Sequence, residues 1–371
     1  MKIKQITELI EELCPLDYAE DFDNVGLLVG DRENEVTGIL VSLDCLEETV
    51  DEAVRSGCNL IVSFHPIIFS GLKKINGKTY VERTVIKAIK NDIAIYAMHT
   101  ALDNSINGVS DKMGEMLGLK NRKVLMPKAG TLKKLSTYVP PNSAEEVRQS
   151  LFRAGAGCIG NYSHCSFNAS GEGTYLGNEE SEPAIGEKQV LQRVSEVLVT
   201  VIFDSHLEGE ILKALKDSHP YEEVAFDVIS VDNRHPEIGM GIIGELDEET
   251  GTRQFLSDLK SIFGSPVIRH SRSNRKTVRK IALLGGSGSF GIGAAITSGA
   301  DVYVTSDLKY HDFFKAEDKI MLADIGHYES EQFTKNLLAD YLTKKITNFA
   351  PALPKGGVIL SKNSTNPINY F

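Results

Sequence analysis

Histidines and carboxylates recur in this sequence just after short apolar runs. The residues concerned are His65, His99, Asp103, His327 and Glu331. Both carboxylates stand four residues beyond a histidine, a spacing that brings two side chains to one face of a helix. Imidazole nitrogens and carboxylate oxygens are ligands for Zn, Mn, Fe or Ni, and the lack of cysteine among them favours a catalytic over a structural zinc site. The pattern therefore predicts a divalent-metal site.

Each histidine–carboxylate pair also has an ordinary structural interpretation. His99 and Asp103 could form a local hydrogen-bonded pair, and His327 and Glu331 could form an exposed pair on a helix. The metal site is favoured because the predicted strands end at one sheet edge, where open α/β sheets bind ligands. A carboxylate such as Glu331 could then bridge two metal ions about 3.5–4 Å apart, as in two-metal hydrolases.

A glycine-rich segment offers a rival hypothesis. Residues 286–291 match G-x-G-x-x-G between a strand pattern and a helical pattern, and Asp307 follows at the end of the next predicted strand. This context predicts binding of a nicotinamide or flavin dinucleotide. The backbone N–H groups of the glycines could instead cradle another phosphate, or the glycines could relieve clashes in a tight turn. A dinucleotide site would leave the histidines and carboxylates without a role.

The elements that must position these residues alternate between strand and helix patterns. Continuous apolar runs between helical segments predict an α/β fold with a mostly parallel sheet. From about Met126 the pattern changes to a β-α-β…β-α-β order, which suits a ferredoxin-like module. We therefore predict a discontinuous metal-binding α/β domain, residues 1–126 and 238–371, that is split by an inserted ferredoxin-like α+β domain, residues 127–237.

Charge and composition exclude several classes of protein. The 371 residues include 51 acidic and 40 basic side chains, a formal net charge of −11 at pH 7. This charge argues against nucleic acid as the main partner, because binding a phosphate backbone needs a basic face. No segment provides the ~20 apolar residues that span a membrane. Acidic residues near the N-terminus and five cysteines without a C-x-x-C pair predict a cytoplasmic protein with reduced thiols and no membrane partner.

Seven segments carry a resemblance to a known family. Five of them resemble the NIF-three-like family, whose members are called GTP cyclohydrolase I type 2 homologues: DNVGLLVG at 23–30, SFHPIIFSGLK at 63–73, AMHTALDN at 97–104, TSDLKYHDF at 305–313 and DIGHYESE at 324–331. Two further segments resemble the longer bacterial members: GAGCIGNYSHCSF at 155–167 and HPYEEVAFDVI at 219–229. The resemblance covers essentially the whole chain. It implies an α/β fold with a dinuclear metal centre, a homohexameric ring and an insert similar to PII/CutA-type ferredoxin-like domains.

The resemblance also implies a set of metal ligands. Carried over by position, His65, Asp103 and Glu331 would hold a first metal. A second metal would be held by His327 and the bridging Glu331. The family's strand-end motif reads His-His-Pro, and its first histidine serves the second metal, whereas this chain has Phe64 there. Phenylalanine cannot ligate a metal, so the second ion should bind more weakly or take a ligand such as His99.

The activity implied by the resemblance is hydrolysis of a nucleotide or another phosphorylated small molecule by a metal-activated water. Up to two ions per chain are expected, with Zn foremost and Mn, Fe or Ni as alternatives. The candidates for acid–base catalysis are His99, Asp307 and His311, and the candidates for a phosphate cradle are Gly286, Gly288 and Gly291. The alternative is a metal-binding regulatory or scaffold hexamer whose PII-like insert senses a ligand without turnover.

Overall fold

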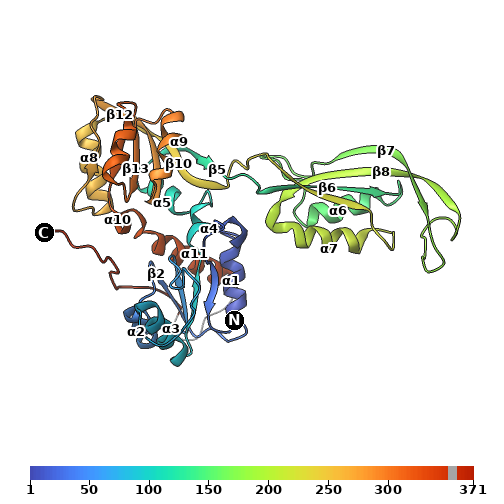
Figure 1. Ribbon diagram of the computed structural model, residues 1–371, viewed down its shortest axis with the longest axis horizontal. Coiled ribbons are helices and arrows are strands. Elements are labelled where there is room, and N and C mark those ends of the chain that lie inside the picture. Colours follow the sequence, from blue (N-terminus) through green and yellow to red (C-terminus); the bar gives the residue numbers. More distant parts are fainter. Residues whose placement is uncertain (350–356) are drawn as a thin grey trace. The chain divides into compact units, whose positions relative to one another are not determined.

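Strands and helices alternate along the computed structural model, which describes residues 1–349 and 357–371 (Figure 1). The chain divides into unit 1, Met1–Pro127 with Pro236–Phe371, and unit 2, Lys128–His235. Several separate sheets, each packed against helices, confirm the mixed α/β class that the sequence predicts.

The first sheet of unit 1 is formed mainly by parallel strands. Its order is β1-β4-β3-β2-β15. The strands are β1 (Gly26–Val29), β2 (Ile39–Ser42), β3 (Leu60–Ser63), β4 (Ala94–Ala97) and β15 (Val358–Leu360). All neighbours run parallel except β1, which pairs antiparallel with β4. Every residue of β2, β3 and β4 is buried, as expected for parallel strands that are covered on both faces.

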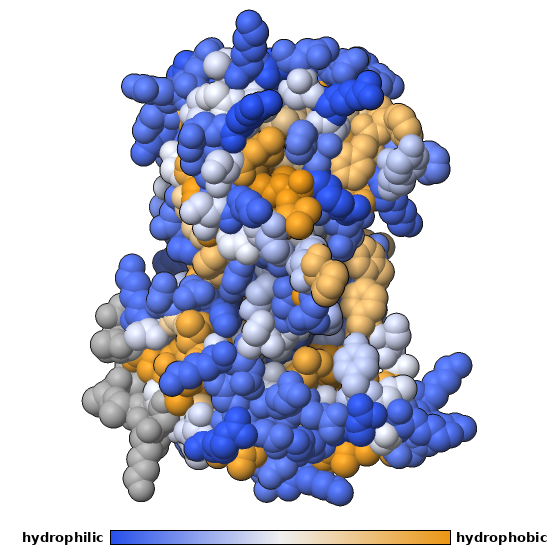
Figure 2. Space-filling view, turned by 90° about the vertical axis from the view of Figure 1, so that its left-hand side faces the viewer, coloured by the Kyte–Doolittle hydropathy of each residue, from blue (hydrophilic) through white to orange (hydrophobic). Residues whose placement is uncertain are grey.

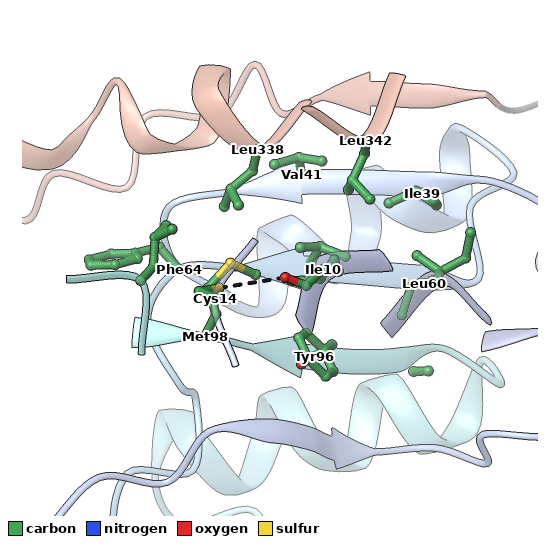
Figure 3. Close-up of a cluster of buried hydrophobic side chains, with 14 of the residues drawn as sticks. Ile10, Cys14, Ile39, Val41, Leu60, Phe64, Tyr96, Met98, Leu338 and Leu342 are labelled. Atoms are coloured by element: carbon green, nitrogen blue, oxygen red, sulfur yellow. Dashed lines mark hydrogen bonds between the residues drawn. The ribbon is translucent and has the colours of Figure 1, made fainter. Parts of the chain in front are cut away.

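Alternate residues of these strands face two different helical layers. The helices are α1 (Ile3–Glu11), α2 (Glu47–Arg55), α3 (Tyr80–Lys90) and α11 (Thr334–Phe349). Figure 3 shows Ile39 and Val41 of β2 in the cluster that contains Leu338 and Leu342 of α11. Leu40, between them, belongs to the cluster formed with α2 and α3. Burial on both faces explains why the strands appear in the sequence as unbroken apolar runs.

The second sheet of unit 1 mixes strand directions. Its order is β11-β14-β13-β12-β10-β5. The strands are β5 (Lys120–Pro127), β10 (Gly239–Gly251), β11 (Arg269–His270), β12 (Thr277–Ser287), β13 (Val302–Ser306) and β14 (Met321–Asp324). Strand β13 runs parallel to β12 and β14, and the other neighbouring pairs are antiparallel. Helices α5 (Val109–Met116) and α8 (Thr252–Phe263) pack in one core cluster, and α9 (Ile292–Thr297) packs in another.

Two short helices begin just beyond the carboxyl ends of parallel strands. Helix α4 (His99–Asp103) follows β4 in the first sheet, and α10 (His327–Glu331) follows β14 in the second. Each helix carries a histidine at its first position and a carboxylate at its fifth. Chemistry-bearing residues therefore lie at strand ends, where α/β sheets bind ligands. The expectation of one sheet edge is wrong, because these strands belong to two sheets.

Unit 2 is an antiparallel sheet with two helices. Its elements are β6 (Leu132–Val139), α6 (Ala144–Arg153), β7 (Phe167–Leu176), β8 (Leu191–Asp204), α7 (Glu208–Ser218) and β9 (Phe226–Val231). The strand order is β7-β8-β6-β9, and all neighbouring pairs are antiparallel. The helices contribute Val147, Leu151, Ile211 and Leu215 to a core that contains residues of unit 2 alone.

The surface is mainly polar on the side drawn in Figure 2. Hydrophilic side chains cover most of this face, and hydrophobic side chains appear in small groups between them. Such a mixed surface is ordinary for folded proteins. Within residues 1–349 and 357–371, no helix is both long enough and apolar enough to cross a membrane.

Candidate metal centre

Three side chains converge between the two sheets of unit 1. His65, His327 and Glu331 each offer a ligand atom, and these atoms all lie within 4.8 Å of one another. Glu331 Oε2 is 3.1 Å from His65 Nε2 and 3.0 Å from His327 Nε2. His65 follows β3, whereas His327 and Glu331 are one turn apart on α10. Two imidazoles and one carboxylate form a donor set that could hold a divalent metal ion.

The contacts of the Glu331 carboxylate indicate that these residues fit a metal ion. Its Oε2 atom is buried and has no hydrogen-bond partner among the described residues, although two imidazole nitrogens lie close to it. The oxygen is thus ion-paired but has no hydrogen bond, and a cation shared with the two rings would complete its interactions. Burial raises the pKa of Glu331, but the two imidazoles outweigh this effect and lower it to about 2. The group is thus ionised and ready to ligate.

A second carboxylate orients each of the two imidazoles. Asp44 Oδ1 lies 2.7 Å from His65 Nδ1, and Asp307 Oδ2 lies 2.7 Å from His327 Nδ1. Because a carboxylate accepts hydrogen bonds, Nδ1 of each ring carries a proton, and Nε2 is turned toward Glu331. Burial alone would lower the pKa of both imidazoles, but the carboxylates raise it to about 10 for His65 and about 11 for His327. This excess of negative charge favours a bound cation, and carboxylate–histidine pairs typically support metal ligands.

Asp103, the fourth predicted ligand, lies outside the three-residue group. Burial and the charge of Glu331 raise the pKa of Asp103 well above its ordinary value, whereas the charges of His65 and His327 act to lower it. The charges of all three residues therefore affect the pKa of the Asp103 carboxyl. A positive charge placed among them would favour its ionised form.

His99 lies next to the group and has its own carboxylate. Its ring centroid is 5.3 Å from that of His65, and its Nδ1 is 2.8 Å from Asp23 Oδ1. Asp23 Oδ2 also accepts hydrogen bonds from the backbone N–H and hydroxyl of Thr100. The fully buried Phe64 ring packs 4.8 Å from His65 and 5.6 Å from His99, between centroids. Phe64 thus provides an apolar wall at the position where the family resemblance expects a ligand.

The glycine-rich segment packs against the carboxylate of Glu331. A Cβ atom added at Gly286 would lie 2.2 Å from Glu331 Oε1, so glycine makes room for this side chain. The N–H of Gly286 donates to Ser330 Oγ, that of Gly288 to the Ser306 carbonyl and that of Gly291 to the Gly288 carbonyl. A phosphate cradled by these glycines would have to displace three existing hydrogen bonds.

Of the other predicted catalytic residues, Asp307 lies beside the three-residue group and His311 does not belong to it. Asp307 bonds to His327, as described above, and also accepts a hydrogen bond from Ser287 Oγ. His311 is exposed on the 3₁₀ helix Tyr310–Ala316, where its ring centroid lies 5.2 Å from that of Tyr310. It is not one of the three residues whose ligand atoms converge.

Two carboxylates that support histidines were missed by sequence reasoning. Asp44 lies two residues beyond β2, the neighbour of β3 in the sheet. A search for carboxylates just beyond the ends of parallel strands could therefore have found it. Asp23 lies three residues before β1 and not after a strand, so its position gives no such indication. Its one signal was its place in a segment that resembles the family.

Comparison with known proteins gives a consistent assignment along the chain. A family model described as Duf34/NIF3 (NGG1p interacting factor 3) matches residues 1–367. The chain is 37% identical over 374 residues to a GTP cyclohydrolase 1 type 2 homolog of Bacillus subtilis (strain 168), covering 99% of this chain and 98% of that protein. It is 34% identical over 375 residues to the protein of the same name in Staphylococcus aureus (strain COL), with both chains fully covered.

A solved structure agrees with these sequence relatives. The crystal structure of a Bacillus cereus protein related to NIF3 superposes with a TM-score of 0.85 at 38% identity, covering 100% of this chain and 99% of that one. The resemblance inferred from the sequence motifs is therefore confirmed. The chain belongs to the Duf34/NIF3 family.

Proposed function

We propose that this protein is a metal-dependent hydrolase that acts on a nucleotide or another phosphorylated small molecule. His65, His327 and Glu331 would hold a divalent ion, with Asp103 as a further ligand. The observation that carries this proposal is the buried Glu331 Oε2, which has no hydrogen bond and lies 3.0–3.1 Å from two imidazole nitrogens. A bound divalent ion supplies a nucleophile by lowering the pKa of its coordinated water.

The remaining residues of the centre would orient groups or move protons. Asp44 and Asp307 hold His65 and His327 with Nε2 facing Glu331. His99 is held by Asp23 beside His65 and is our candidate for the general acid–base group. Such a group must come within hydrogen-bond reach of the reacting atoms, and imidazole is the commonest choice at neutral pH.

We propose that one ion is held tightly and that a second is held weakly, with Zn as the native metal. The buried Phe64 ring stands beside His65 and His99 and offers no donor atom. A second ion near His327 and Glu331 would therefore need more water ligands, which lowers its affinity.

A regulatory homohexamer without turnover is the second candidate, and unit 2 favours it. A cavity of about 680 Å³ lies in this unit, lined by residues that include Tyr138, Tyr175, Glu196 and Tyr221. We propose that unit 2 is an inserted ferredoxin-like domain, with boundaries near residues 127 and 237. The order β7-β8-β6-β9 with two β-α-β connections supports this proposal. A ligand bound in this cavity would then regulate the homohexameric assembly that the family resemblance implies.

Metal content per chain tests the proposed centre. Untagged wild type would be purified without added metal or chelator and analysed beside Glu331→Gln, Phe64→His and the exposed control Glu317→Gln. We expect between one and two ions in the wild type and the control, a loss of most metal in Glu331→Gln, and a rise toward two in Phe64→His. A metal-free wild type, even after incubation with Zn or Mn, would exclude the hydrolytic mechanism.

A substrate screen then separates the two functions. A hydrolase should turn over a nucleotide or phosphorylated compound in a metal-dependent manner, and Glu331→Gln should retain its fold but lose turnover. A regulator should instead show saturable binding of a small molecule without turnover. Native mass would test the hexamer in either case.

A further inference from the structure

The C-terminal segment 361–366 contacts elements on both sides of the candidate metal centre, namely α2 beside the first sheet and α10 after the second. It is anchored near the first sheet, where the Ser361 hydroxyl and the Lys362 N–H both donate to Glu52 of α2, at 2.6 and 2.9 Å. At its other end, Asn366 Nδ2 donates to Glu329 Oε1 of α10 at 3.1 Å. Both acceptors are buried carboxylates. The segment is therefore fixed at two points by charge-assisted hydrogen bonds, which are the stronger kind.

Between these two contacts, Thr365 binds Asp44, the carboxylate that orients the proposed ligand His65. Its hydroxyl donates to Asp44 Oδ2. The other oxygen of the same carboxylate, Oδ1, is bonded to His65 Nδ1. The contacts therefore form a chain from Thr365 through Asp44 to His65, and His65 Nε2 faces Glu331.

The position of this segment matters because the ligands come from separate elements. His65 follows β3 in the five-stranded sheet, whereas His327 and Glu331 lie on α10 after the six-stranded sheet. Thr365 contacts the support of the first ligand, and its neighbour Asn366 contacts the helix that bears the other two. A metal site keeps its affinity only when its ligands and their supporting groups are held in the right geometry.

We propose that Thr365 is a positioning residue of the metal centre. Its hydroxyl fixes the Asp44 carboxylate, and through it the His65 ring, so that the C-terminal segment 361–366 is part of the site. This inference rests on the proposed function, because it concerns the affinity of the proposed ion. Thr365 itself touches neither the ion nor the three ligands.

The test compares metal affinity in matched variants of the full chain. Thr365→Val removes the hydroxyl and keeps the side-chain shape, whereas Thr365→Ser restores the hydroxyl. Thr297→Val is the control, because it also removes a threonine hydroxyl, but from an exposed residue of α9 whose hydroxyl donates to the Gly293 carbonyl. The Kd for Zn²⁺ would be measured by competition with a chelator, and the visible absorption of bound Co²⁺ would report ligand geometry.

We expect Thr365→Val to raise the Kd by about 10-fold, near the lower end of the effect of losing a supporting group. Thr365→Ser and Thr297→Val should bind Zn²⁺ as the wild type does. In an Asp44→Ala background, Thr365→Val should have no further effect, because its path to His65 is already broken. The Co²⁺ spectrum should change in Thr365→Val and recover in Thr365→Ser.

Two results would overturn the inference in distinguishable ways. An unchanged Kd and Co²⁺ spectrum in Thr365→Val, beside a wild type that loses its metal in Glu331→Gln, would refute the role of Thr365 alone. A wild type without Glu331-dependent metal binding would refute the proposed function as well. An effect of Thr365→Val that persists in full after Asp44→Ala would refute the path through Asp44.

Discussion

Three histidines near the candidate centre each bond a carboxylate through Nδ1. The pairs are Asp44–His65, Asp307–His327 and Asp23–His99. Such a pair fixes both the tautomer and the orientation of the ring, which a lone histidine at a strand end cannot do. The chemical character of the centre thus depends on acidic residues that do not themselves belong to the ligand group.

The Asp23 carboxylate should stabilise the fold in a pH-dependent manner. Burial raises the pKa of Asp23, but hydrogen bonds from His99 and Thr100 outweigh burial and lower it from 3.8 to about 2. A carboxyl whose pKa is lowered in the folded state stabilises the protein above its unfolded-state pKa. This stabilisation is lost as the pH falls from about 4 toward 2.

We therefore expect Asp23→Asn to lower the free energy of unfolding by about 1.5–3 kcal/mol at pH 7, the usual contribution of hydrogen bonds to a charged group. The difference from the wild type in urea denaturation should narrow as the pH falls from about 4 to 3. The exposed Asp21→Asn serves as the control and should have little effect. A difference that stays constant down to pH 3 would show that ionised Asp23 is not the stabilising species.

Among the elements, the ends of the strands determine which groups meet. Helix α10 carries His327 and Glu331 one turn apart, and the end of β12 runs beside it at Gly285 and Gly286. Gly286 has a φ of +67°, in the left-handed region, and leaves no room for a Cβ beside Glu331. The strand end therefore needs glycine both for its backbone conformation and for the carboxylate that it contacts.

Gly286→Ala should accordingly displace Glu331 and reduce metal content to less than half of the wild-type value. It should also lower the free energy of unfolding by about 1–3 kcal/mol, because a non-glycine residue is strained at this φ. Gly293→Ala in α9 is the matched control, since an added Cβ there meets no atom within 4 Å. Elemental analysis and thermal denaturation would measure both effects. Full metal content in Gly286→Ala would contradict the close packing against Glu331.

At the level of the whole chain, the two units have separate cores. The clusters that contain the metal-centre elements consist of unit 1 residues, and the cluster of unit 2 draws on unit 2 alone. The two segments of unit 1 meet where β5 and β10 pair antiparallel, with Pro127 opposite Gly239. The chain thus leaves unit 1 and returns to it at neighbouring positions.

Replacing residues 128–235 by a short Gly/Ser linker should therefore leave unit 1 folded and its metal content unchanged. The reason is that the paired ends of β5 and β10 need only a hairpin connection. Circular dichroism and elemental analysis would test this, with Glu331→Gln in the shortened chain as the control that should lose metal. An unfolded or metal-free shortened chain would show that unit 1 depends on unit 2.

Several features could be predicted from the sequence because they are local. Unbroken apolar runs predicted buried strands, and the placement of His65, His327 and Glu331 beyond such runs predicted that they would lie at strand ends. The glycine segment was also visible, but its packing against Glu331 was not. The reason is that its match to a phosphate-binding pattern says nothing about which side chain approaches it.

The partners of these residues depend on contacts between distant parts of the chain. Asp44 is 21 positions from His65, Asp23 is 76 from His99, and Thr365 is 321 from Asp44. Periodicity and spacing report which residues share one strand or one helix face. They do not report the order β1-β4-β3-β2-β15, nor that α10 meets the end of β3. The residue types at the centre therefore follow from the sequence, whereas their pairing arises only when the two sheets and the C-terminal segment pack together.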